Sequence, residues 1–178
     1  MDIGLVMLVK DETRRLEGAL GPILDQLAQV IVIDTGSTDG TPDLLREKLG
    51  IEPLFDRLDP RRCGSHADLR NRGLAMLDTP WRMTLDADER LSPEGLKCLR
   101  GTPPGPEVGG IFLRWKNFLE NGDTFDDYKC VFFRRGIRKV GLIHDNVQPS
   151  LRRHGTIATW CDAVYLEHRP EACKDAWK

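Results

Sequence analysis

The sequence predicts an α/β domain in which a parallel β-sheet is followed by a run of further strands. Over residues 1–100, apolar segments of strand length alternate with segments in which apolar residues recur at helical spacing. This alternation is typical of a parallel sheet with helices on its faces. After the loop 101–110, which is rich in Pro and Gly, the chain is mostly β-branched and aromatic, and this composition predicts further strands.

Two buried strands and an intervening helix are predicted at the start of the chain. The apolar run 3–9 is too short for a typical helix and ends in charged residues, so it predicts a strand. Apolar residues at helical spacing then predict a helix over 12–27, which the Gly21-Pro22 pair is expected to kink or divide. The second strand is expected at 30–34, and the small polar residues 36–42 predict a dense turn.

The next helix is predicted over 41–50. Thr41 suits its N-cap, Pro42 its first helical position and Gly50 its end. The remaining expected elements are, in order, a weak strand at 51–55, a helix at 65–77, a strand at 81–89, a helix opened by Ser92 and Pro93, and strands at 110–119, 128–135 and 156–168.

Composition and charge indicate one globular domain. The chain has 178 residues, of which 40% are hydrophobic and 30% charged, and the net charge of −2 does not indicate nucleic acid or an anionic membrane as partner. The five cysteines form no C-x-x-C pair, which argues against a disulfide scaffold or a thiolate zinc site and favours a reducing cytoplasm. The N-terminus lacks the features of a signal peptide, and no apolar run approaches the roughly 20 residues of a membrane span.

Acidic residues follow three of the predicted strands. They are Asp11-Glu12 after the first strand, Asp34 after the second, and Asp86, Asp88 and Glu89 after the fourth. In open α/β sheets, ligands bind outside the carboxyl ends of the strands. We therefore expect carboxylates from three strand ends to converge on one cleft.

Asp86 and Asp88 form a D-x-D pair directly after an apolar strand. Side chains two residues apart project to the same side of an extended segment, and carboxylate oxygens suit Mg²⁺ or Mn²⁺. Like charges in one cleft need a compensating cation, and such a metal can neutralise charge on a departing diphosphate. The alternative is a solvated turn that caps the helix beginning near Ser92.

The segment DTGSTDGT offers a second binding element. Its small residues allow close approach of a ligand to the backbone, and Asp34 could accept a hydrogen bond from a base or a ribose. It is not a phosphate-binding P-loop, and no G-x-G-x-x-G follows the first strand. The alternative is an ordinary strand-to-helix turn with good capping residues.

Several segments occur in an order that points to one family. The chain contains, in order, LVMLVKDETRRLEGAL, VIVIDTGSTDGT, ADLRNRGLAML, WRMTLDADERL, YKCVFFRRGIRKVGLIHDNV and YLEHRP. Together they resemble the family 2 glycosyltransferases, whose GT-A fold is a three-layer α/β sandwich with a mostly parallel mixed sheet. The resemblance covers roughly residues 3–170. It implies transfer of a sugar from a nucleoside-diphosphate-sugar donor with a divalent metal.

The resemblance also implies roles in nucleotide binding. Asp34 matches the acidic residue that contacts the nucleoside base, and Ser37 and Asp39 lie in the same turn and are expected to shape it. Asp56, beyond the third strand, is a further candidate for the base. Arg70 matches a helix arginine near the nucleotide, and the alternative for Arg70 is an ordinary surface ion pair.

By the same resemblance, Asp86 and Asp88 form the motif for the metal and the ribose. Asp88 is expected to be the more direct ligand of Mn²⁺ or Mg²⁺. His168 matches a late histidine that completes the metal or diphosphate site, and a histidine simply packed in a strand is the alternative.

Transfer to an acceptor hydroxyl requires a base that takes its proton. The segment GLIHDNV offers His144 and Asp145, and Asp145 stands where the family's His-Glu pair has its acid. We expect Asp145 to be the base and His144 to contact donor or acceptor. Direct displacement by the hydroxyl would invert the anomeric carbon. The alternative is that Asp145 caps a local turn.

The chain departs from the family pattern at three places. Asp11-Glu12 replaces the more usual Asn-Glu, Asp145 is one methylene shorter than Glu, and the chain ends at Lys178, where many relatives continue. We expect one domain over 1–178, in which residues 1–100 are a nucleotide-binding half. Residues 101–178 are expected to be an acceptor-side half. The short chain is expected to be a minimal enzyme, one truncated at its C-terminus, or a catalytically weak remnant.

The expected function is inverting, metal-dependent transfer from a nucleoside-diphosphate-sugar, first of all a UDP-sugar, to a glycan or lipid-linked acceptor. The expected setting is cell-surface polysaccharide or lipopolysaccharide synthesis in the cytoplasm, with peripheral docking at the inner face of the membrane and no nucleic-acid partner. Two alternatives stay open: a nucleotide-sugar-binding module without turnover, and a haloacid dehalogenase-type phosphatase. Candidates for the acceptor site, or else for plain sheet surface, are Arg114, Trp115, Arg134 and Arg135.

Overall fold

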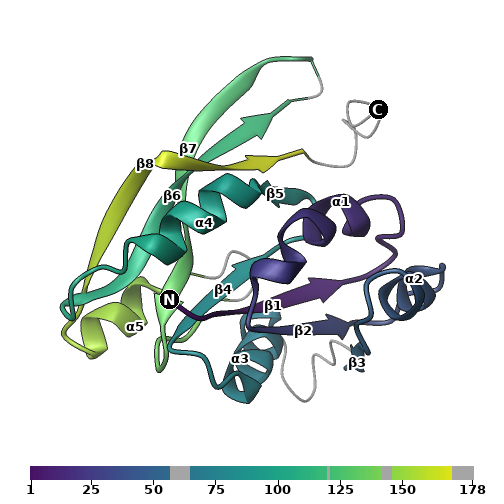
Figure 1. The fold of residues 1–178 in the computed structure, drawn as a ribbon, viewed down its shortest axis with the longest axis horizontal. Helices are drawn as coiled ribbons and strands as arrows, with labels where there is room; N and C mark the ends of the chain where they lie inside the picture. The colour runs from purple at the N-terminus through teal and green to yellow at the C-terminus, as the bar shows by residue number, and fades with distance from the viewer. Residues whose placement is uncertain (57–64, 120, 142–145, 170–178) are drawn as a thin grey trace.

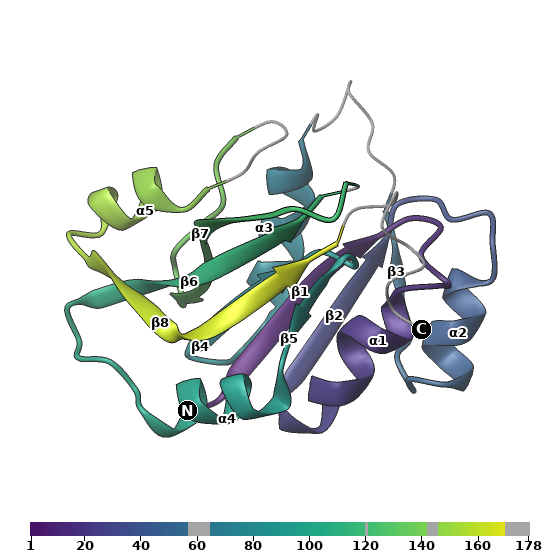
Figure 2. The same ribbon diagram turned by 90° about the horizontal axis from the view of Figure 1, so that it is seen from above.

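A mixed β-sheet forms the centre of the molecule (Figure 1). The computed structural model describes residues 1–56, 65–119, 121–141 and 146–169. Within these residues the sheet has eight strands in the order β3-β2-β1-β4-β7-β6-β8-β5, which can be followed in Figure 2. The predicted α/β class with a mixed sheet is confirmed.

The first half of the chain forms a parallel sheet. Its strands are β1 (Ile3–Val9), β2 (Gln29–Asp34), β3 (Leu54–Phe55) and β4 (Trp81–Leu85). β1 pairs in parallel with both β2 and β4, and every residue of β1 is buried. A strand that is covered on both faces must be apolar throughout, which is why this strand was predictable from a continuous apolar run.

The second half of the chain adds long strands. They are β6 (Val108–Phe118), β7 (Thr124–Arg134) and β8 (Ile157–His168), and the short β5 (Glu89–Leu91) joins them at the edge. β7 is antiparallel to β4 and so connects the two halves of the sheet. β8 ends beside β5, so the chain returns to the acidic segment that follows β4. The long strands bend away from the parallel half (Figure 1).

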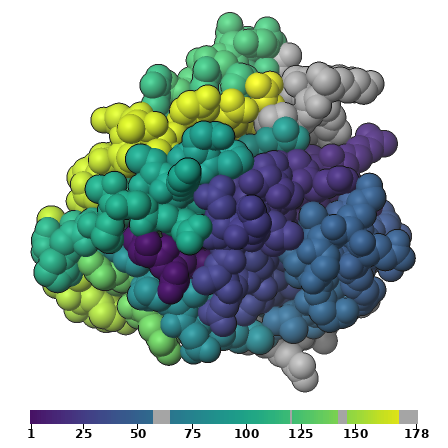
Figure 3. All heavy atoms as spheres, in the orientation of Figure 1, coloured from purple at the N-terminus to yellow at the C-terminus, as the bar shows by residue number. Residues whose placement is uncertain are grey.

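Helices cover both faces of the sheet and make three layers. One face is covered by α1 (Leu16–Leu20), the 3₁₀-helix η1 (Gly21–Gln26), α2 (Thr41–Glu47) and α4 (Pro93–Gly101). The other face is covered by α3 (His66–Met76) and α5 (Gln148–Arg153). β1 divides its side chains between the two cores, with Leu5 and Met7 in the first and Val6 and Leu8 in the second. Figure 3 shows α1, α2 and α4 packed side by side over the first face.

The structure confirms that the first helix is divided at Gly21, where α1 gives way to η1. The prediction that Thr41 is an N-cap is wrong, because α2 begins at Thr41 and Gly40 is its N-cap. The Thr41 hydroxyl instead donates to Asp39 Oδ1 at 2.6 Å and accepts from the Glu12 amide at 2.8 Å. It therefore ties the turn after β2 to the segment after β1.

The strand predicted over 81–89 ends at Leu85, and Glu89 begins a separate strand, β5. The break is a turn in which the Glu89 amide donates to the Asp86 carbonyl at 3.0 Å. The helix α5 was not predicted, because it is only six residues long and contains Pro149 and two arginines. In the described part of the chain, no helix is both long and apolar enough to cross a membrane.

Candidate active site

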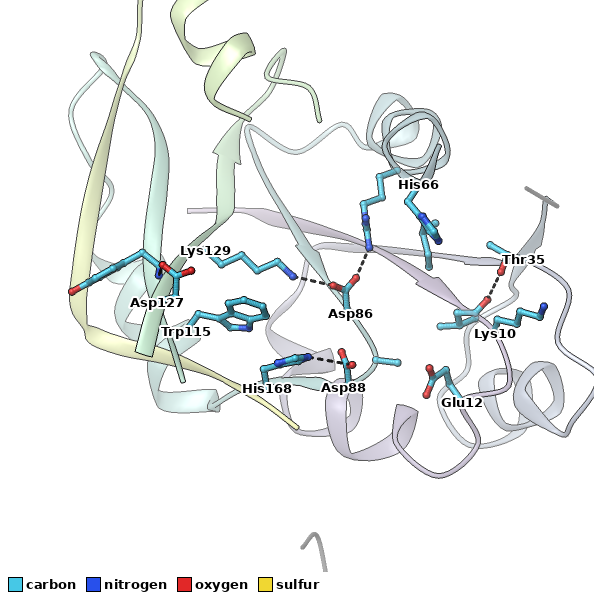
Figure 4. Close-up of a pocket in the computed structure, with 15 residues that line it drawn as sticks. Lys10, Glu12, Thr35, His66, Asp86, Asp88, Trp115, Asp127, Lys129 and His168 are labelled. Carbon is cyan, nitrogen blue, oxygen red and sulfur yellow. Dashed lines mark hydrogen bonds and ion pairs between the residues drawn. The ribbon is translucent and has the colours of Figure 1, made fainter. Parts of the chain in front are cut away.

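A cavity of about 550 Å³ opens where the strands of the parallel half end. Val9 at the end of β1, Thr35 after β2 and Asp86 after β4 contribute to its lining. Figure 4 shows Asp86 and Asp88 in the middle, between a group from the parallel half, Lys10, Glu12, Thr35 and His66, and a group from the long strands, Trp115, Asp127, Lys129 and His168. The cavity therefore lies between the two halves of the sheet.

Asp86 is held by two cations. An Arg70 guanidinium nitrogen, from α3, donates to Asp86 Oδ1, and Lys129 Nζ, from β7, donates to Asp86 Oδ2 at 2.9 Å. The same Lys129 ammonium donates to Glu89 Oε1 at 2.6 Å, and the Asp86 amide donates to Glu89 Oε2 at 3.0 Å. These four residues form one closed network under the cavity. The structure thus brings the predicted Arg70 and Asp86 together, as an ion pair.

Burial and charge shift the pKa values in this network in opposite directions. Burial alone would raise the pKa of Asp86, but the charges of Lys129 and Arg70 hold it well below its usual range. Burial raises the pKa of Glu89, which is fully buried, and Lys129 offsets this only in part. Burial opposes the charge on Lys129, yet Glu89 and Asp86 raise its pKa above the ordinary value. Lys129 is therefore a permanently charged group in the cavity.

Asp88 and His168 face each other. Their closest atoms, Asp88 Oδ2 and His168 Nε2, are 3.4 Å apart. The other ring nitrogen, His168 Nδ1, lies 2.7 Å from Asn117 Oδ1, while Asn117 Nδ2 donates to the Trp115 carbonyl at 3.0 Å. Because Asn117 Oδ1 is thereby fixed as an acceptor, Nδ1 of His168 donates to it. Nε2 is the ring nitrogen that faces Asp88.

This pair fits a divalent metal ion better than Asp86 does. A carboxylate oxygen and an imidazole nitrogen are available side by side, and the ring is oriented by a partner on its far nitrogen, as in many metal sites. Both oxygens of Asp86 already accept from cations. In the described ranges, no group of three His, Cys, Asp or Glu side chains is arranged to hold a metal. Asp88 and His168 could therefore supply two ligands to such an ion.

Asp34 lies at the end of β2 and is almost fully buried. Its Oδ1 accepts from the amides of Gly36 and Ser37 at 2.8 and 2.7 Å. Its Oδ2 is buried and has no hydrogen-bond donor in the part of the chain that the structure describes. An unsatisfied buried acceptor is costly, and none of the described residues offsets that cost here. Asp34 itself does not line the cavity, but the next residue, Thr35, does.

Ser37 and Asp39 tie the turn after β2 to the segment after β1. Ser37 Oγ accepts from the Asp11 amide at 2.9 Å, and Asp39 Oδ2 accepts from the Thr13 hydroxyl at 2.9 Å. Asp11 in turn accepts from the Thr38 amide at 2.7 Å and has a positive φ of 56°. Asp11, Ser37 and Asp39 therefore hold the two loops together and do not line the cavity.

Asp56 forms an ion pair with Arg72 of α3 and does not line the cavity. His144 and Asp145, the expected catalytic pair, lie outside the described residues. Of the acceptor-site candidates, Trp115 lines the cavity. Arg114 instead pairs with Asp126.

The other two basic candidates for the acceptor site also lie away from the cavity. Arg134 Nε donates to the Val108 carbonyl at 2.7 Å, and the guanidinium lies over the ring of Trp81. Arg135 lies near Asp78. Arg134 and Arg135 therefore belong to the sheet surface.

The cavity residues that were not predicted as site residues include His66, Asp127 and Lys129. Asp127 and Lys129 are two apart on β7, so their side chains project to the same face of the strand. That face could have been found only by knowing that β7 pairs with β4, which is a contact between distant segments. His66 is the first residue of α3, directly after the N-cap Ser65, whose hydroxyl accepts from the Asp68 amide at 3.1 Å.

Solved structures identify the class to which this fold belongs. TarS of S. aureus, residues 1–349 in complex with UDP-GlcNAc, superposes with a TM-score of 0.69 over 99% of this chain and 61% of that chain, at 12% identity. Glucosyl-3-phosphoglycerate synthase of Mycobacterium tuberculosis, in complex with Mg²⁺ and UDP, gives 0.65 over 96% and 72%, at 16% identity. At such low identity the likeness shows the fold, which is the predicted GT-A fold of glycosyltransferases.

The chain belongs to glycosyl transferase family 2, whose model matches residues 5–101. It is 36% identical over 107 residues to a TPR repeat-containing protein of Synechococcus elongatus, and 33% identical over 82 residues to the lipopolysaccharide core biosynthesis glycosyltransferase LpsC of Rhizobium meliloti. The matches cover 60% and 46% of this chain, but only 25% and 28% of these relatives. The matched part of the chain thus spans about a quarter of the length of each of these relatives.

Proposed function

We propose that this domain is an inverting, metal-dependent glycosyltransferase that moves a sugar from a nucleoside-diphosphate-sugar, first of all a UDP-sugar, to a hydroxyl acceptor. The observation that carries the proposal is the meeting of Asp86, Asp88 and His168 in one cavity at the carboxyl ends of parallel strands. Membership of family 2 and solved neighbours with UDP or UDP-GlcNAc support the choice of donor.

In this proposal, the parallel half binds the nucleoside. The base lies near Asp34 and Thr35, and the unsatisfied Asp34 Oδ2 accepts one of its N–H groups. Arg70 holds Asp86, which accepts from the ribose hydroxyls. Ser37 and Asp39 act by keeping the loop in shape, and Asp56 contributes to the base pocket through its position beside β2.

The residues proposed to hold Mn²⁺ or Mg²⁺ are Asp88 and His168. When bound there, the ion would neutralise charge that develops on the departing diphosphate. Asn117 accepts from Nδ1 of His168 and so keeps Nε2 directed at Asp88. The ring of Trp115, whose centroid is 4.7 Å from that of His168, restricts the movement of the imidazole.

Chemistry at the sugar needs one proton transfer. The acceptor oxygen forms a bond to the anomeric carbon while the bond from that carbon to the diphosphate oxygen breaks. The acceptor proton passes to Asp145, the proposed base, with His144 beside it contacting donor or acceptor. Attack opposite to the leaving diphosphate inverts the anomeric centre, and no covalent sugar–enzyme bond is formed.

The proposed setting is the synthesis of a cell-surface glycan, on a glycan or lipid-linked acceptor at the inner face of the membrane. It is suggested by the similarity to LpsC, whose name places that relative in lipopolysaccharide core biosynthesis. Residues 1–178 are proposed to form one domain, with a donor half at 1–100 and an acceptor half at 101–178.

The release of free UDP tests turnover. Purified protein is incubated with a panel of UDP-sugars, Mn²⁺ and glycan or lipid-linked acceptors, and UDP is measured. Acceptor-dependent release is expected, and Asp145→Asn should abolish it while UDP still binds. Tight binding of UDP-sugars with no release for any acceptor would instead identify a binding module without turnover.

A further inference from the structure

Lys129 is a cation placed against the D-x-D pair by a distant strand. It projects from β7 into the cavity, where Figure 4 shows its ammonium group next to Asp86. Only 24% of its side chain is exposed, and the ammonium lies 5.3 Å from the centroid of the Trp115 ring. Its position is therefore fixed by two carboxylates and an aromatic face.

With Lys129 in place, both carboxylate oxygens of Asp86 accept hydrogen bonds from cationic side chains. Arg70 donates to one carboxylate oxygen and Lys129 donates to the other. A protonated lysine has only donors, so it cannot itself coordinate a metal ion. A divalent ion that bound Asp86 would have to displace the ammonium group or lie directly beside it, and like charges at that distance repel strongly.

Asp88 is in a different position. Its Oδ2 lies 3.4 Å from His168 Nε2, and among the described residues its nearest lysine or arginine is Arg15, at 4.0 Å. Arg15 is itself engaged by Glu12, to which it donates at 2.6 and 2.8 Å. The two aspartates of the pair thus differ in what surrounds them, although they are only two residues apart.

We propose that Lys129 keeps the divalent ion away from Asp86, which stays available to the nucleotide, so that of the described residues only Asp88 and His168 hold the ion. This inference rests on the proposed function, because it assigns roles within the proposed donor site. With two protein ligands, the ion binds weakly to the nucleotide-free protein. It binds tightly once a diphosphate supplies further oxygen ligands, so nucleotide and metal enter as a pair.

A charge-matched double variant gives the sharpest test. Asp86→Asn/Lys129→Met removes one negative and one positive charge, so the net charge of the site stays that of the wild type. Mn²⁺ binding to the nucleotide-free protein is measured from the decrease of the free Mn²⁺ signal in electron paramagnetic resonance. The wild type and the double variant should have the same affinity within about twofold. Removal of a residue that supports a metal site typically lowers metal affinity by about 10- to 100-fold. Such a loss of Mn²⁺ affinity in the double variant would show that Asp86 is a metal ligand and overturn the proposal.

The single variant Lys129→Met tests the same idea in the opposite direction. It frees one oxygen of Asp86, so the nucleotide-free protein should bind Mn²⁺ at least about tenfold more tightly. Lys129→Arg keeps the cation and should bind Mn²⁺ like the wild type. Lys116→Met, on the neighbouring strand and away from the cavity, is the matched control. Unchanged or weaker Mn²⁺ binding by Lys129→Met would overturn the proposal.

Lys129→Met, alone or combined with Asp86→Asn, leaves the fully buried Glu89 without its ion-pair partner, and circular dichroism shows whether each variant folds. A variant that does not fold is replaced by the same variant with Glu89→Gln added, and the same Mn²⁺ result is expected of it. Titration of the wild type with UDP in the presence of Mn²⁺ tests the proposed function separately from the role of Lys129. Absence of UDP binding would contradict the proposed function, whereas the comparison of variants without nucleotide decides the role of Lys129.

Discussion

At the scale of single residues, the site depends on side chains that are held by a second partner. His168 is held by Asn117, which is itself held by the Trp115 carbonyl. Asn117 is buried and lies opposite His168 in the β6–β8 register. Because both the nitrogen and the oxygen of this buried amide have hydrogen-bond partners, the amide has one orientation. The hydrogen bond to Nδ1 then fixes the orientation of the imidazole ring.

Asn117→Ala should weaken metal-dependent UDP binding. Without its acceptor, Nδ1 of His168 has no partner that fixes the ring, so the ring can rotate, which should lower the Mn²⁺ affinity of the UDP complex by about tenfold. Calorimetric titration of Mn²⁺ into protein saturated with UDP measures the effect. The control is Asn121→Ala, which removes the same side chain from the exposed β6–β7 turn. An equal effect of both substitutions would contradict the role of Asn117.

Cys130 should be inert as a thiol. Burial raises its pKa to about 12, from an ordinary value of 9.0, so the thiol form is favoured by folding. Its contribution to stability is therefore present below pH 9.0 and is lost as the pH rises towards about 12. Brief alkylation with iodoacetamide at about pH 8 should label the exposed Cys98 and leave Cys130 unlabelled until the protein is denatured. Equal labelling of the two in the native protein would show that β7 opens readily.

At the scale of elements, α3 carries Arg70 and packs closely on the sheet. Gly73, one turn after Arg70, lies against β1 and β2, and a Cβ atom built there would be 2.8 Å from Val6 Cγ1 and 3.2 Å from Ile33 Cδ1. Glycine is therefore required by close packing of the helix on the strands. The position of the Arg70 guanidinium depends on that approach.

Gly73→Ala should destabilise the protein although alanine is the better helix former. The gain in helix propensity is about 1 kcal/mol, whereas overpacking a core typically costs about 1–3 kcal/mol, so we expect a net loss. Gly101→Ala is the matched control, since a Cβ there meets nothing within 4 Å. Urea denaturation measures both, and Gly101→Ala should be neutral or slightly stabilising. A stabilised Gly73→Ala variant would mean that α3 does not approach the sheet this closely.

The sequence predicted a strand or helix well where the residues of that element alone produce the pattern by which it is recognised. β1 and β2 are continuous apolar runs, and α3 and α4 have the N-caps Ser65 and Ser92, whose hydroxyls accept from amides three residues on. These elements were predicted, and so was the arrival of Asp86 and Asp88 at a strand end. The environment of Asp86 was not predictable, because it depends on pairing between segments that are far apart in sequence.

Lys129 illustrates this limit most clearly. It is 43 residues from Asp86 and 40 from Glu89, and nothing in its local sequence distinguishes it from a surface lysine. Only the antiparallel pairing of β7 with β4 brings it to the cavity. Asp34 was predicted as a contact for the base, but its burial beneath the turn was not, because the turn is closed by Asp11, which belongs to another loop.

At the scale of the whole molecule, one sheet runs through both halves of the chain. β4 and β7 are paired through Trp81 with Arg134, Arg82 with Phe133 and Met83 with Phe132. Phe132 and Phe133 are fully buried, one in each of the two hydrophobic cores. Residues from both halves of the chain therefore contribute to one hydrogen-bonded sheet and to both hydrophobic cores.

This continuity predicts one cooperative unfolding transition. Differential scanning calorimetry should give a calorimetric enthalpy equal to the van't Hoff enthalpy, as expected for a two-state domain. UDP with Mn²⁺, at about 100 times its dissociation constant, should stabilise the whole transition by about 2.7 kcal/mol. Two separate transitions, of which only one responds to UDP, would show that residues 1–100 and 101–178 unfold independently.

The central claim is that Asp88 and His168 hold a metal that binds the diphosphate of a nucleotide donor. Calorimetric titration of UDP, with and without Mn²⁺, tests it most directly, on the wild type and on Asp88→Asn. The wild type should bind UDP much more tightly with Mn²⁺ than without, and Asp88→Asn should lose this difference. If UDP, GDP and dTDP all fail to bind under either condition, or if Asp88→Asn keeps the full Mn²⁺ dependence, the claim is wrong.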